Sequence, residues 1–156
     1  MAGFEYRYML NGGNHPVIKD FYMKDTETLT KGDLVNIEVG EIDLAVTNDT
    51  DFAGAFLGTV NPDDERDTAH ARTPGKVAGT DSTTKVRVII SPDAVYSTAD
   101  NNDRDAGATL DISGATGAMT VVATVNADVV VVEDKNTNGD PTFVLLSQLN
   151  HYLARR

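Results

Sequence analysis

The sequence predicts an all-β chain, built as a small antiparallel β-barrel or a jelly-roll-like sandwich with an extended N-terminal arm. Short segments rich in Val, Ile and Thr recur at a spacing of roughly 8–12 residues, with turn residues between them. No segment carries the apolar periodicity of an amphipathic helix. The stretch from Gly107 to Glu133 is mostly Thr, Val, Ala and Gly, which is typical of residues that pair and pack in sheets.

Turn signals divide the chain into the expected elements. Lys31-Gly32-Asp33 precedes a strand, and Gly40-Glu41 is a candidate hairpin turn between two strands. The expected strands cover residues 28–30, 34–39, 42–46, 52–60, 85–90, 110–112, 120–125, 129–133, 142–146 and a short final 149–153. Polar loops are expected at 61–84 and 91–106, and the first is long enough to be typical of functional loops. The domain division is an arm over 1–26 and a β domain over 27–156.

The N-terminal segment 1–26 is unusually aromatic. It holds five of the ten Phe and Tyr residues of the chain: Phe4, Tyr6, Tyr8, Phe21 and Tyr22. The first three alternate with charged residues, which is the spacing of a strand. The aromatics of this arm either cover the end of the domain's own core or dock on another subunit, where Tyr and Phe are favoured. We take all five as candidate partner-binding anchors.

Charge limits the classes of partner. The chain carries 13 Lys and Arg against 24 Asp and Glu, a net charge of −11. Phosphate backbones and anionic membranes repel such a surface, so no nucleic-acid or membrane partner is expected. The N-terminus has no signal-peptide pattern and no window reaches the apolar length of a membrane span, so we expect a soluble protein made in a cytoplasm. Without cysteine, neither disulfides nor thiolate metal sites are possible.

No motif predicts catalysis or a bound metal. His15, His70 and His151 are far apart and lack zinc-ligand spacing. Residues 134–139 match the first half of a calcium loop, but Leu145 stands where the closing Glu should be, so a hairpin with an Asn-Gly turn is expected instead. The Asp-rich stretch 100–105 is expected to be a solvated loop. We therefore expect no enzyme, no cofactor and no metal.

Four segments of the β region carry a family resemblance. LDISGATGA at 110–118 and NADVVVVE at 126–133 look like the C-terminal half of small capsid decoration (cement) proteins of tailed bacteriophages. KGDLV at 31–35 and FLGTV at 56–60 resemble the first strands of that family. In these proteins a strand opens after a KGD-type turn and a later "LG.V" strand returns beneath it. The similarity covers residues 27–134.

The resemblance implies a structural virion protein that binds the outer surface of a phage capsid and stabilises the shell. It implies a β-barrel or jelly-roll-like module, often a homotrimer at threefold lattice positions. Its partners would be the major capsid protein and further copies of itself, without cofactor or catalytic activity. The loop at 61–84 and the aromatic arm would then be additions specific to one lattice.

Two other functions remain open from the sequence. A virion adhesion or carbohydrate-binding module predicts exposed aromatics in loops near a cation, whereas the long loops here contain only Tyr96. A tail-tube or head-completion subunit predicts a long hairpin and ring assembly. An enzyme ranks last, because no catalytic constellation stands out.

Overall fold

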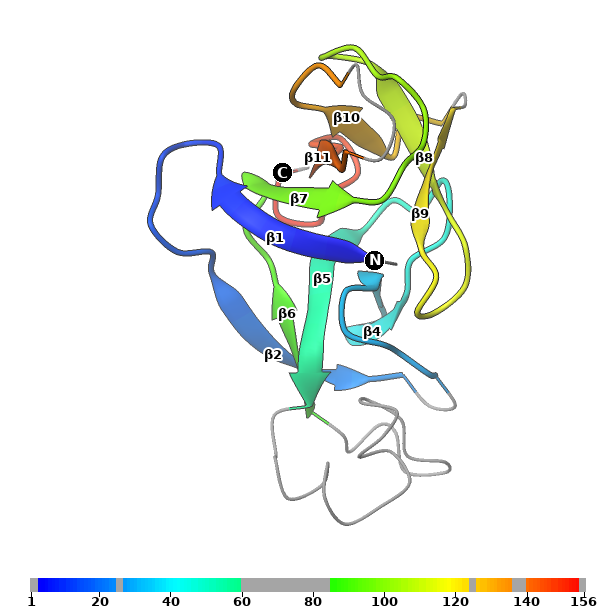
Figure 1. Cartoon of the computed structure of the whole chain (residues 1–156). Coiled ribbons are helices and arrows are strands. Elements are labelled where there is room, and N and C mark those ends of the chain that lie inside the picture. Colours follow the sequence, from blue (N-terminus) through cyan, green and yellow to red (C-terminus); the bar gives the residue numbers. More distant parts are fainter. Residues whose placement is uncertain (1–2, 25–26, 60–84, 124–125, 136–139, 155–156) are drawn as a thin grey trace.

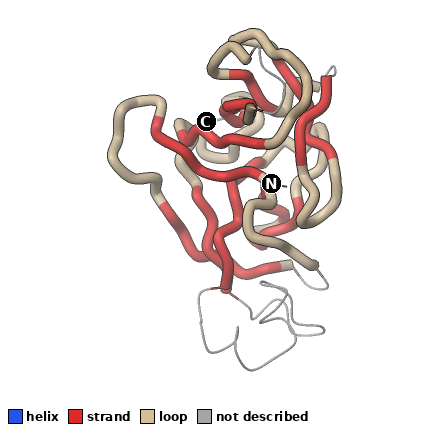
Figure 2. Tube along the Cα trace, viewed as in Figure 1, coloured by secondary structure: helices blue, strands red, loops and turns tan. Residues whose placement is uncertain are grey.

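The chain is built entirely from strands in the part that the structure describes. The computed structural model describes residues 3–24, 27–59, 85–123, 126–135 and 140–154. These residues form eleven β-strands and no helix (Figures 1 and 2), so the predicted all-β class is confirmed. The expected loop at 61–84 and the Asn138-Gly139 turn lie outside the described residues.

Five strands close into a barrel. In order around it they are β2 (Ile18–Met23), β4 (Glu41–Leu44), β3 (Leu34–Glu38), β5 (Phe52–Thr59) and β6 (Lys85–Ile89). β2 runs parallel to β4, and the other neighbouring pairs are antiparallel. Val39 and Gly40 connect β3 to β4 with φ of 51° and 83°, and positive φ at both central residues is the conformation of a tight hairpin turn.

The other six strands form an antiparallel sheet, which lies above the barrel in Figure 1. Its order is β1 (Phe4–Met9), β7 (Ala94–Thr98), β11 (Thr142–Leu146), β10 (Val129–Val131), β8 (Thr109–Ser113) and β9 (Thr120–Ala123). The expected polar loop at 91–106 is wrong over β7, whose five residues are all buried in the sheet. The expected short strands at 28–30 and 149–153 are turns and loops in the structure, apart from a bridge between His151 and Phe52.

Two apolar cores result from this arrangement. One joins the six-stranded sheet to the barrel and includes Phe4, Phe52 and Ile89. The second fills the barrel and includes Met23 and Phe56. β5 is buried on both faces because it contributes to both cores.

Gly54 permits the close approach of β5 to its neighbours. Its φ is 148°, a region that L side chains rarely adopt. A Cβ atom there would lie 1.8 Å from the Ile89 carbonyl oxygen and 2.9 Å from the Tyr96 hydroxyl. Gly54 is therefore required by the close contact of β5 with Ile89 of the barrel and with Tyr96 of the six-stranded sheet.

The N-terminal segment differs from the expected extended arm. Phe4–Met9 pairs with β7 as the edge strand of the six-stranded sheet, and Ile18–Met23 pairs with β4 and β6 inside the barrel. Local alternation indicates a strand but carries no information about a partner strand that lies far along the chain. The segment 1–26 and the segment 27–156 are thus joined through shared sheets.

Two buried carboxylates link loops that are distant in sequence. Asp33 accepts hydrogen bonds from Thr30 N (2.7 Å), Thr116 Oγ1 (2.5 Å) and Gly117 N (2.8 Å). These contacts tie the turn before β3 to the loop between β8 and β9. A buried carboxylate is tolerated when hydrogen bonds replace its hydration, so this junction fixes the barrel against the six-stranded sheet.

The second carboxylate, Asp128, has an equivalent role. It accepts hydrogen bonds from Asn48 N (2.9 Å), Thr47 Oγ1 (2.9 Å) and Ile112 N (3.0 Å). The loop after β4 is thereby held on β8.

The C-terminal residues close one end of the barrel around a buried histidine. Leu153 N donates to His151 Nδ1 (3.1 Å), so Nε2 carries the proton and donates to the Ala53 carbonyl (3.0 Å). Burial lowers the pKa of His151 below its ordinary value of 6.5, although the hydrogen bond to Ala53 opposes the shift. The folded protein therefore holds this ring neutral.

This histidine predicts a loss of stability in mild acid. The unfolded chain protonates His151 at a higher pH than the folded chain, so its contribution is complete above about 6.5 and declines as the pH falls below that value. We expect the melting temperature to fall more steeply between pH 7 and pH 5 than in His151→Gln, which cannot titrate. Parallel slopes for the two proteins in thermal melts across this range would contradict the prediction.

Candidate interaction surface

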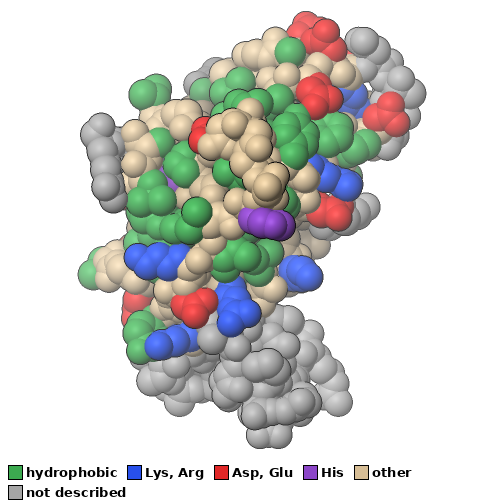
Figure 3. All heavy atoms as spheres, turned by 90° about the vertical axis from the view of Figure 1, so that its left-hand side faces the viewer, with side chains coloured by type: hydrophobic (Ala, Val, Ile, Leu, Met, Phe, Trp, Pro, Cys, Tyr) green, Lys and Arg blue, Asp and Glu red, His purple; other side chains and the backbone are tan. Residues whose placement is uncertain are grey.

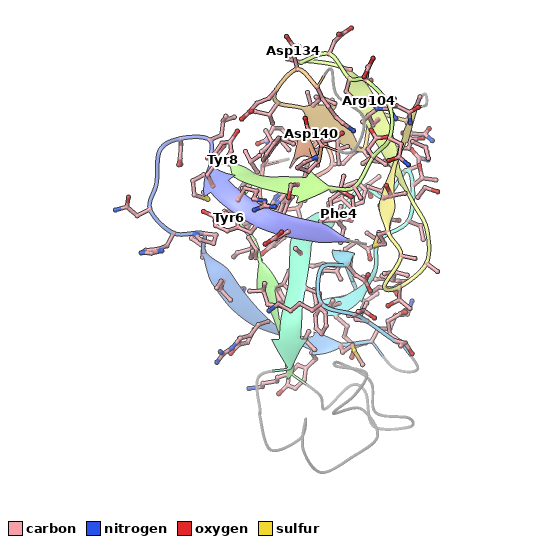
Figure 4. The ribbon with its side chains drawn as sticks, viewed as in Figure 1. Phe4, Tyr6, Tyr8, Arg104, Asp134 and Asp140 are labelled. Carbon is pink, nitrogen blue, oxygen red and sulfur yellow. The ribbon has the colours of Figure 1, made fainter. Side chains whose placement is uncertain are left out.

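The five aromatic residues predicted as anchors lie on two strands and differ in exposure. Figure 4 shows Phe4, Tyr6 and Tyr8 along β1. Phe4 is 2% exposed and belongs to the core between sheet and barrel, and Tyr6 is partly buried against the same core. These two side chains therefore cover the chain's own interior, which is one of the two alternatives left open by the sequence.

Tyr8 is held at the surface by Glu133, which lies two residues after the end of β10. Its hydroxyl donates to Glu133 Oε1 at 2.6 Å, and its ring centroid lies 6.5 Å from that of Phe143. The hydrogen bond to Glu133, with burial and the negative charge of that carboxylate, raises the pKa of Tyr8 to about 12. The side chain is thus already engaged within the chain.

The last two aromatics lie on β2, and only one of them is exposed. Phe21 is partly buried and packs edge-on against Tyr152, with centroids 6.3 Å apart. Tyr22 is 45% exposed, and Lys85 Nζ lies 5.4 Å from the centre of its ring. Of the five candidates, Tyr22 is the one that remains available to a partner.

Tyr22 belongs to an exposed surface that we call the β2–β6 face. It consists of the solvent-exposed side chains on one side of these two strands: Ile18, Asp20, Tyr22, Lys85 and Arg87. Figure 3 shows hydrophobic and basic side chains gathered on this side of the molecule. Arg87 pairs with Asp20 at 3.5 Å. Five of the six residues of β2 are not buried, so this strand presents most of its surface to solvent.

A second feature, the acidic pocket, lies on the β3–β4 part of the barrel. Its volume is about 520 Å³, and residues of β3, β4 and the loops beside them line it. Five of the lining residues are acidic: Glu27, Glu38, Asp43, Asp49 and Asp51. The end of β2 pairs with β4, so this pocket adjoins the β2 side of the barrel.

One lysine and one shared proton partly offset the charge of this pocket. Lys24 Nζ forms ion pairs with Glu38 Oε2 and, at 2.9 Å, with Asp43 Oδ2. Burial raises the pKa of Glu27 to about 7, and its hydrogen bond to Asp43 acts in the same direction. Although burial alone would raise the pKa of Asp43, the hydrogen bonds from Glu27 and Lys24 lower it. Glu27 therefore carries the proton and donates to Asp43.

Neutralising Glu27 is expected to protect the protein at alkaline pH. The folded chain binds this proton up to a pH of about 7 and the unfolded chain only to about 4.5, so stability is lost as the pH rises between these values. We expect Glu27→Gln to lose less thermal stability than the wild type between pH 5.5 and pH 8, by a few degrees. Glu133→Gln, outside the pocket, is the control. An identical pH dependence for wild type and Glu27→Gln would contradict the assignment.

In the Asp-rich stretch 100–105, Asp100 is occupied by the chain's own groups. Asp100 forms a nearly buried ion pair with Arg104 (2.7 Å) and accepts from Asn102 and Thr142. Burial alone would raise the pKa of Asp100, but the hydrogen bonds from Arg104 and Asn102 lower it. Figure 4 places Arg104, Asp134 and Asp140 at the end of the six-stranded sheet away from the barrel. Within the described ranges, no cluster of three or more His, Cys, Asp or Glu side chains suits a metal ion.

Sequence reasoning missed the acidic pocket. The acids around the Gly40 turn were visible, but the parallel pairing of β2 with β4, which brings Lys24 beside Asp43, leaves no local signal. The buried roles of Asp33 and Asp128 were missed because both residues sit in ordinary turn sequences.

Comparison with known proteins assigns no family. No protein-family model matches the chain, and no curated protein and no solved structure is significantly similar to it. Among the residues that the structure describes, there is no helix with the length and apolar content of a membrane span.

Proposed function

We propose that this chain is a structural virion protein that binds the outside of a tailed-phage capsid and stabilises the shell. The proposal follows from the resemblance of residues 27–134 to capsid decoration proteins. Its partners are the major capsid protein and, in a homotrimer, further copies of the chain.

One observation carries the proposal: the segments that bear the resemblance meet in space. Asp33 of the KGD turn binds Thr116 and Gly117 of the SGATG segment. β3 opens directly after this turn, and β5, which contains most of the "LG.V" segment, returns antiparallel beside it. The first two segments build the barrel strands β3 and β5, and the last two build β8 and β10 of the six-stranded sheet, which Asp33 joins to the barrel.

A binding role also accounts for the exposed β2–β6 face. Ile18 and Tyr22 are 49% and 45% exposed on an ordered strand, and apolar residues displayed together on a surface are typical of partner-binding sites. Binding of many copies to a lattice adds contacts between neighbouring capsid subunits. Such contacts would resist the outward force of packaged DNA.

The test is to add the purified chain to capsids of its source phage from which the chain has been removed. We expect it to co-sediment with those capsids and to give density on their outer surface in electron cryomicroscopy, and to raise the temperature at which they lose DNA. Density on the tail would favour a tail-tube or head-completion subunit. Absence of the chain from intact virions, measured by mass spectrometry, would overturn the proposal.

A further inference from the structure

Among the described residues, the β2–β6 face carries more basic than acidic side chains. Lys85 lies over the ring of Tyr22 and forms no ion pair within the described part of the chain. Arg87 pairs there with one carboxylate, Asp20, and both of these side chains are about half exposed. Two cations thus face solvent beside one described anion, on a chain whose net charge is −11.

The acidic pocket carries an excess of negative charge. Five carboxyl groups line it, and Lys24 forms ion pairs with two of them. Its volume of about 520 Å³ is large enough to admit long basic side chains. Glu38 at the rim keeps half of its side chain exposed.

Both surfaces also display apolar side chains beside their charges. Ile18 and Tyr22 do so on the β2–β6 face, while Val46, 57% exposed, lines the acidic pocket. Val39, 97% exposed, stands on the adjacent β3–β4 turn. Each surface therefore offers an apolar contact together with charge of one sign, and the two signs are complementary.

We propose that a second copy of this chain docks its β2–β6 face on the acidic pocket, with Lys85 and Arg87 directed at the carboxylates and Tyr22 against Val46. The contact joins two unlike surfaces, and repetition of such a heterologous contact between copies gives a closed ring or an open chain. This proposal rests on the self-association included in the proposed function, and it specifies which two surfaces make the contact.

Charge reversal tests the contact with the purified full chain alone. One variant, Lys85→Glu with Arg87→Glu, reverses the β2–β6 face. A second, Glu38→Lys with Thr50→Lys, reverses the rim of the acidic pocket, and all four positions are exposed. The matched control, Lys31→Glu with Asp140→Lys, changes exposed charges outside both surfaces. Circular dichroism and thermal melts establish that each variant is folded.

Sedimentation velocity over a concentration series supplies the readout. We expect the wild type and the control to associate, more weakly at high salt because salt screens charge pairs. Each reversed variant should associate at least about tenfold more weakly. An equimolar mixture of the two variants should recover association, because the reversed surfaces are again complementary.

Three results would overturn the contact: a wild type that stays monomeric, reversed variants that associate like the control, or a mixture that fails to recover. Capsid co-sedimentation is measured separately, so a monomeric chain that still binds capsids refutes this contact and leaves the capsid role intact. A chain that associates as proposed but never binds capsids supports this contact and refutes the capsid role.

Discussion

Deleting residues 2–24 is expected to abolish folding. The deletion removes β1 and β2 together, so the barrel loses the strand that joins β4 to β6 and the six-stranded sheet loses the edge that covers β7. It also removes Phe4 and Met23 from the two cores. The remaining chain should show no cooperative thermal transition and should bind the dye ANS.

Single substitutions separate this explanation from a general effect of shortening the chain. Phe4→Ala should cost about 3–5 kcal/mol, because a buried aromatic ring is lost. Tyr22→Ala, at an exposed position of the same segment, should change stability by less than about 0.5 kcal/mol. A truncated protein that melts cooperatively, together with a mild Phe4→Ala, would instead support a detachable arm.

Gly54→Ala is expected to have the largest effect of any single methyl group added to the described glycines. The new Cβ would lie 1.8 Å from the backbone oxygen of Ile89, and backbone cannot move aside as a flexible side chain can. Forcing the strands apart should cost about 3 kcal/mol or more, or a fall in melting temperature of roughly 6–12 °C.

Gly12→Ala is the matched control for this substitution. Gly12 also has a positive φ, of 79°, but nothing lies within 4 Å of its added Cβ. The control therefore measures the conformational cost alone, about 1–2 kcal/mol. If chemical denaturation gave equal losses in the free energy of unfolding for the two variants, the steric clash at Gly54 would be relieved and the prediction contradicted.

The sequence predicts strands that carry a clear apolar pattern and misses a strand that buries polar residues. β6 and β3 begin and end within a residue of the expected 85–90 and 34–39, because apolar side chains alternate there or run continuously. β7 was missed because its Ser97 and Thr98 are polar yet buried, with Arg7 Nε donating to Ser97 Oγ at 2.7 Å. Polar residues that are buried inside a sheet look like loop residues in sequence.

The candidate surface was predictable only as a set of residue types. An aromatic N-terminal segment was evident, but which of its rings would be buried depends on pairings with residues 85–98. The chain reverses between β1 and β2 so that Phe4 enters a core while Tyr22 faces solvent. The acidic pocket depends on the same parallel β2–β4 contact, which no local pattern encodes.

The placement of β1 and β2 also constrains the order in which the chain can fold. Residue 4 pairs with residue 98 and residue 18 with residue 89, so β1 and most of β2 wait for strands made much later, although the end of β2 can pair earlier with residues 41 and 42. The last segment is needed as well, since Phe52 exchanges backbone hydrogen bonds with Asn150 and Tyr152. Contacts of such long sequence separation slow folding and leave unpaired strand edges exposed to other nascent chains. The complete fold therefore forms only after residues 150–152 have been made, and its yield in a cell should depend on chaperone capacity and on growth temperature.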